Sequence, residues 1–104
     1  MKKVLIAVAI SALSFSTLTS AAGDVAAGKA KSGMCAACHG ANGISMIPTY
    51  PNLAGQKSAY TAKQLKDFKN KTRKDPVMAA MVAALTDTDI ENLSAYYESL
   101  KCGK

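Results

Sequence analysis

The sequence predicts a small all-helical domain that follows a removable leader. Apolar residues recur at three- and four-residue intervals in residues 58–71 and again in residues 86–100, which is the spacing of one face of an α-helix. No segment predicts a strand with comparable strength, and glycines and prolines keep residues 40–56 out of regular structure. The length of 104 residues fits one domain and excludes a multidomain assembly.

Residues 1–21 are typical of a secretory signal peptide. Two lysines precede the apolar run 4–10, and a stretch rich in Ser and Thr leads to Ala21, after which we expect cleavage. A membrane-spanning helix needs about 20 predominantly apolar residues, so stable membrane insertion is not expected and an uncleaved anchor is the alternative. The mature chain would be residues 22–104, with eleven Lys and Arg against seven Asp and Glu, or +4.

The first helix of the mature chain is expected in residues 25–32, with Asp24 as its N-cap. Residues 35–39 would then lie at its far end or just beyond it. A turn cluster at residues 40–43 follows, and the prolines and glycine of the next dozen residues predict a long irregular loop.

Two helices follow this loop. The first covers residues 58–71, with lysines filling its polar face and an apolar face made of Ala62, Leu65 and Phe68. Asp75 followed by Pro76 is a cap with proline at the first helical position, and it opens a short apolar helix in residues 77–84.

The last helix starts at a capping box. Thr86 and Asp89 have the required spacing of three residues. The apolar face of this helix comprises Ile90, Leu93, Tyr97 and Leu100. A mature chain of this size buries a marginal core, so we expect a covalent or cofactor-based reinforcement.

Residues 35–39 read Cys-Ala-Ala-Cys-His and carry the chemistry of the chain. In this motif two thiols lie about one helical turn apart, so both can form thioethers with one edge of a haem. The imidazole that follows is thereby aimed at the iron. His39 is the only histidine of the sequence, and it stands where the motif requires it. The motif therefore predicts a covalently attached haem.

Three other interpretations of these cysteines stay open. Zinc would need four ligands, and beyond the motif residues only Cys102 is available as a soft or imidazole ligand. A thioredoxin-like redox pair needs alternating strands and helices, a pattern that the sequence lacks. A structural disulfide is the third alternative, although three cysteines are an odd number.

The order and spacing of the motifs resemble the class I c-type cytochromes, in particular small bacterial monohaem cytochromes c and one half of the periplasmic dihaem cytochromes. The resemblance covers residues 22–104. It rests on Gly23-Asp24 with Gly28 and on the segments 35–40, 48–56, 63–68, 75–78 and 85–90. It implies the cytochrome c fold, about four short helices around one covalently attached haem c per chain.

The resemblance also implies roles for individual residues. Cys35 and Cys38 would form the thioethers, and His39 would be the proximal iron ligand. The carbonyl of Pro48 would accept a hydrogen bond from the other ring nitrogen of this histidine and fix its orientation. Met78, shortly before the last helix, holds the place of the distal iron ligand.

Other positions bear on the same resemblance. Gly28 and Tyr96 match a close crossing of the first and last helices. Ser32 stands where many members have an aromatic residue, which leaves this helix contact open. Cys102 is a second departure, and we expect a free surface thiol there, with intermolecular pairing as the alternative.

Two features also have a simpler interpretation. Methionine often fills core space, and Met81, one turn deeper in the same helix than Met78, is the competing ligand. A basic stretch is most often a solvated helix face. The alternative is a docking surface that comprises Lys63, Lys66, Lys69, Lys71, Arg73 and Lys74.

The sequence thus predicts a periplasmic electron-transfer protein rather than an enzyme. With two protein ligands on the iron, no open position is left for a substrate, and single electrons would pass between respiratory partners through an exposed haem edge. Partners with acidic docking surfaces are expected, such as a membrane oxidase or reductase, and the chain is expected to be a monomer. Nucleic acid is disfavoured because no aromatic residues interleave with the basic ones. The alternatives are an open-site haem enzyme or gas binder, and a non-haem thiol oxidoreductase.

Overall fold

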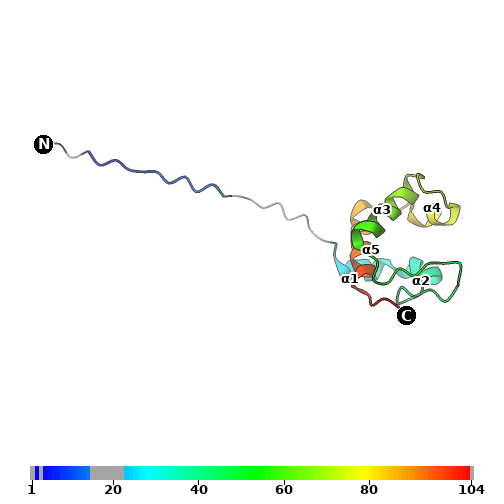
Figure 1. Cartoon of the computed structure of the whole chain (residues 1–104). Coiled ribbons are helices and arrows are strands. Elements are labelled where there is room, and N and C mark those ends of the chain that lie inside the picture. Colours follow the sequence, from blue (N-terminus) through cyan, green and yellow to red (C-terminus); the bar gives the residue numbers. More distant parts are fainter. Residues whose placement is uncertain (1, 3, 15–22, 104) are drawn as a thin grey trace.

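The computed structural model describes residues 2, 4–14 and 23–103, and within them the domain is built from helices alone (Figure 1). The five helices of this part are α1 (Val25–Lys31), α2 (Gly33–His39), α3 (Ser58–Lys69), α4 (Pro76–Val82) and α5 (Asp87–Ser99). The predicted all-helical class is confirmed. So is the long irregular loop, which separates α2 from α3.

Ser32 ends the first helix, which was predicted for residues 25–32, and separates it from α2. Its amide and its hydroxyl both bond to the carbonyl of Lys29, at 3.2 and 2.8 Å, and this closes α1. The carbonyl of Ser32 then accepts from the amides of Cys35 and Ala36, both at 3.0 Å. The haem motif therefore has a short helix of its own.

The leader is described only in part. Residues 4–14 form neither helix nor strand, and their large apolar side chains are exposed. The cleavage position expected after Ala21 lies outside the described residues. In the described segments, no helix has both the length and the apolar character that crossing a membrane requires.

Side-chain caps fix the starts of three helices at the residues that the sequence indicated. Asp24 accepts from the amide of Ala27 at 2.9 Å, and Asp75 accepts from the first turn of α4. Thr86 and Asp89 form the reciprocal capping box of α5. Each such cap contributes about 1 kcal/mol to helix stability, which is substantial for helices of seven to thirteen residues.

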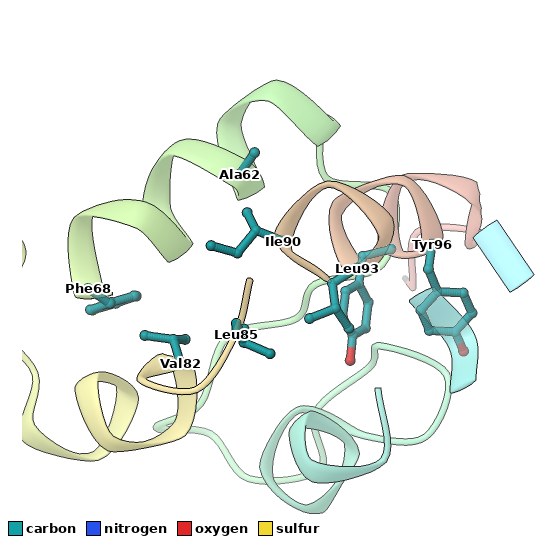
Figure 2. Packing of buried hydrophobic residues seen from close by; sticks show 8 residues of the cluster. Ala62, Phe68, Val82, Leu85, Ile90, Leu93 and Tyr96 are labelled. Atoms are coloured by element: carbon teal, nitrogen blue, oxygen red, sulfur yellow. The ribbon is translucent and has the colours of Figure 1, made fainter. Parts of the chain in front are cut away.

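The core is organised around α5, against which α1 and α3 pack, while α4 packs on α3. Ile90 and Leu93 are fully buried at its centre (Figure 2). The rest of the buried cluster comprises Ala62, Phe68, Val82, Leu85, Tyr96 and Tyr97. The predicted apolar faces of residues 58–71 and of the last helix are therefore confirmed, with Leu65 and Leu100 at the margin of the cluster.

Helix α1 meets α5 through a glycine. A Cβ built on Gly28 would collide with the backbone carbonyl of Asn92 and would lie 2.7 Å from the Cβ of Tyr96. Gly28 is also the only buried residue of α1. The predicted contact between Gly28 and Tyr96 is thus present, and it depends on the missing side chain.

Candidate haem site

Helix α2 brings the two thiols and the imidazole of the haem motif together. Cys35 and Cys38 are half-buried and one turn apart, and His39 is 7% exposed. The helix ends at Gly40, whose φ of +86° is a conformation that L side chains rarely adopt. A Cβ there would also collide with the carbonyl of Ile44. The chain can therefore turn sharply immediately after His39.

The ring of His39 is held from one side by the backbone of the following loop. Its Nδ1 lies 2.8 Å from the carbonyl oxygen of Pro51. A carbonyl only accepts hydrogen bonds, so Nδ1 carries the proton and donates it. A metal binds at the other ring nitrogen, Nε2, whose lone pair is free when only Nδ1 carries a proton.

The partner of His39 is Pro51 and not Pro48, so the prediction for Pro48 is wrong in the structure. The amide of Tyr50 bonds to the carbonyl of Ile47 at 3.0 Å, and this closes a turn with Pro48 and Thr49 at its exposed tip. Pro51 follows the turn, where the chain comes back toward α2. Proline is favoured at the second position of such turns, and this signal could have separated the two prolines.

Hydrogen bonds hold residues 52–54, which directly follow Pro51. The amides of Leu53 and Ala54 both donate to the carbonyl of Gly43, at 2.8 and 3.0 Å. The side chain of Asn52 accepts from the amide of Ser45 at 2.7 Å. These bonds help to hold the Pro51 carbonyl in place relative to His39.

Cys35 packs against the buried cluster beside Tyr97. Burial raises the pKa of the Cys35 thiol. Burial, and next the neighbouring thiol, raise the pKa of Tyr97. The Tyr97 hydroxyl is buried and makes no hydrogen bond within the described part of the chain, and nothing in the sequence pointed to it as a neighbour of the first attachment cysteine.

Met78 lies on α4, on the same buried cluster as Cys35. Its amide is fixed by Asp75 at 2.9 Å, and its side chain is half-buried against the cluster. Met81, expected deeper in the packing, is 41% exposed. Met34 and Met46 are exposed as well, so Met78 is the most buried methionine of the described residues.

The residues present fit a covalently attached haem better than they fit zinc. Two half-buried thiols at one-turn spacing and an imidazole whose Nδ1 is held by the Pro51 carbonyl are the donor set that the motif needs. In the described part of the chain, no three His, Cys, Asp or Glu side chains come together as ligands of one metal ion. Helices α2 and α4 extend toward the same side of α5 (Figure 1).

The comparisons with known proteins agree with this donor set. The cytochrome c family matches residues 25–101. The chain belongs to the cytochrome c family. As in this family, Cys35 and Cys38 together with His39 form the attachment motif for one covalently bound haem c.

Several cytochromes are similar to this chain. It is 42% identical over 101 residues to cytochrome c4 of Pseudomonas aeruginosa, covering 97% of this chain but only 50% of that protein. It is 43% identical over 81 residues to cytochrome c-554(548) of Halomonas halodenitrificans, covering 75% of this chain and 98% of that one. The crystal structure of reduced recombinant cytochrome c4 from Pseudomonas stutzeri superimposes with a TM-score of 0.73 at 42% identity, covering 77% of this chain and 47% of that structure. The chain thus spans about half the length of its cytochrome c4 relatives.

Proposed function

We propose that this chain is a single-haem electron carrier in which His39 and Met78 would hold the haem iron. The observation that carries the proposal is the hydrogen bond from Nδ1 of His39 to Pro51, at the end of the helix that presents both thiols. Membership of the cytochrome c family supports it, and so does the packing of Met78 on the cluster that Cys35 also contacts.

The protein residues define the chemistry at this site. When bound, the haem would supply a one-electron couple at its iron. The Pro51 carbonyl keeps the proton on Nδ1 of His39 and raises the basicity of Nε2. A second protein ligand from Met78 would complete the iron coordination, so a substrate would find no open position. Electron transfer is therefore favoured over the open-site enzyme.

The first test is the mass and the spectrum of the exported protein. We expect the mass of residues 22–104 plus one haem, a reduced pyridine haemochrome spectrum of the c type, and no carbon monoxide binding by the ferrous protein. The mass also tests cleavage after Ala21 and export to the periplasm. Binding of carbon monoxide would favour the open-site enzyme, and a haem-free mass would favour a thiol oxidoreductase.

We propose that redox partners carry acidic surfaces and that these surfaces contact only part of the basic stretch of this chain. Three of its lysines are engaged within the molecule. Lys63 pairs with Asp67, and this hydrogen bond lowers the pKa of Asp67. Lys66 pairs with Glu91 at 3.0 Å, and Lys69 donates to the carbonyl of Leu85.

The remaining cations lie at the turn between α3 and α4. Arg73 donates to Gln64 at 2.7 Å and stacks 4.5 Å from the ring centre of Phe68, two contacts that orient its charge without neutralising it. Lys71, Arg73 and Lys74 line one hollow together with Asp75, Pro76 and three alanines, Ala79, Ala80 and Ala83. Its three cations outnumber the one carboxylate, which caps α4, so the hollow suits an acidic protein segment that also buries apolar area.

Reversing two of these charges tests the docking proposal. The double variant Lys71→Glu, Lys74→Glu should transfer electrons to an acidic acceptor protein about tenfold more slowly at low salt, because steering by charge accelerates association. Its rate should also depend less on salt, since exposed charges are screened over about 10 Å at 0.1 M. The pair Lys29→Glu, Lys101→Glu carries the same charge change at other exposed positions. Equal slowing in both double variants would show that only net charge matters.

A further inference from the structure

The C-terminal tail lies against the loop that holds His39 (Figure 1). A Cβ built on Gly55 would collide with Sγ of Cys102, so the sulfur sits directly on the α-carbon of this glycine. One residue later, a Cβ built on Gly103 would lie 2.7 Å from Cδ1 of Ile44. The tail therefore contacts both limbs of the loop.

Gly55 is suited to this contact by its conformation as well as by its size. Its φ is +73°, in the left-handed region that favours glycine. Its amide donates to the carbonyl of Tyr97 at 2.8 Å, and the amide of Leu100 donates to the same oxygen at 3.2 Å. The last turn of α5 thus holds the loop and the start of the tail at one point.

The contact is connected to the haem site through a short segment. Gly55 is four residues from Pro51, and the amides of Leu53 and Ala54 between them are bonded to Gly43. The carbonyl of Pro51 accepts a hydrogen bond from Nδ1 of His39. A displacement of Gly55 would therefore move a segment that has the acceptor of His39 at its other end.

We infer that Cys102 is a positioning residue for the proximal histidine. Its sulfur holds Gly55 against the last turn of α5, and the segment 51–55 transmits this restraint to the hydrogen bond between Pro51 and His39. The inference rests on the proposed function for its consequence at the iron, because a weaker hydrogen bond lowers the basicity of the histidine ligand. Less basic imidazole stabilises ferric iron less, so loosening the loop raises the reduction potential.

The test measures by NMR how fast individual protons of the haem-loaded, ferrous protein exchange with solvent. In Cys102→Ala, the Nδ1 proton of His39 and the amide proton of Gly55 should exchange about tenfold faster, because local opening exposes them without global unfolding. The amide of Leu93, at the centre of α5, should keep its rate. The reduction potential should rise in the same variant. Cys102→Ser retains an atom at the Sγ position and should restore most of the protection.

A second pair of variants tests the contact itself. Gly55→Ala introduces a methyl group where the sulfur of Cys102 lies, and we expect it to accelerate exchange of the His39 Nδ1 proton. Part of this acceleration should disappear when Cys102→Ala is added, because the sulfur that the methyl group would meet is then absent. Such non-additivity is expected only for groups in contact. Met46→Ala, at a side chain of the same loop that is 95% exposed, should leave all the rates unchanged.

Two results would overturn the inference. Unchanged exchange of the His39 Nδ1 proton in Cys102→Ala would show that the sulfur does not position the histidine. Equal acceleration at Leu93 would show a contribution to global stability only. Neither result would affect the proposed carrier function, which the haem spectrum and carbon monoxide binding test separately.

Discussion

Replacing Gly28 by alanine is expected to force α1 away from α5 and to destabilise the domain by about 3 kcal/mol, at the upper end of typical overpacking costs. The new Cβ would meet the carbonyl of Asn92 and the Cβ of Tyr96, which are both fixed in α5. Gly28 is the only buried residue of α1, so the helix has no buried side chain to keep it in place. Small domains have a net stability of about 5 to 15 kcal/mol, and a large part of it would be lost.

Gly33→Ala is the matched control for this substitution. It adds the same methyl group at another helical glycine, but a Cβ there meets nothing within 4 Å. Alanine at a helical position is favoured over glycine by about 0.5 to 1 kcal/mol, so this variant should be as stable as the unchanged protein or more so. Guanidinium unfolding of the two haem-loaded variants measures the difference. Equal stability of the two would contradict the role assigned to the crossing.

The helices were predictable because their signals are local. Asp24, Asp75 and the pair Thr86 and Asp89 mark helix starts, and each lies two or three residues from an amide that its side chain accepts from. The apolar faces of α3 and α5 follow from spacing within each helix. The sequence left open whether residues 35–39 end the first helix or follow it, because the division between α1 and α2 depends on Ser32 bonding back to Lys29 rather than on a glycine or proline.

The haem motif was also a local signal, whereas its surroundings depend on contacts between distant segments. The acceptor of His39 is set by how the loop folds back on Gly43, and this distinguishes Pro51 from Pro48. The engaged lysines are another case, since Lys66 and Glu91 are 25 residues apart. Periodicity placed Lys66 on the polar face of its helix but could not show that it pairs with Glu91. No signal in the sequence predicts the contact between Cys102 and Gly55.

The second large effect is expected at Met78, where the functional proposal is decided. Met78→Ala should remove the distal ligand, open the sixth iron position to carbon monoxide and lower the reduction potential. The potential falls because a thioether ligand favours ferrous iron and raises the potential of the haem. The fold should persist, because the cap at Asp75 bonds to the backbone amides of α4 and not to the side chain that is lost.

Met81→Ala is the control from the same helix. Met81 is 41% exposed, so its truncation should cost about 1 kcal/mol rather than the 2 to 5 kcal/mol typical of a buried methionine. The variant should keep the weak red absorption band that marks sulfur ligation of ferric haem, and it should not bind carbon monoxide. Both variants are compared with the unchanged protein in the same two measurements.

The red absorption band and carbon monoxide binding together test the ligand assignment separately from the carrier function. If Met81→Ala loses the red band and Met78→Ala keeps it, the distal ligand is Met81 and the carrier function stands. In that case α4 would have to rotate so that the exposed side chain of Met81 faces inward, because Met78 is the methionine that packs on the core here. If the unchanged protein lacks the band and binds carbon monoxide, neither methionine is a ligand, and the open sixth position makes the chain a haem enzyme or gas binder instead.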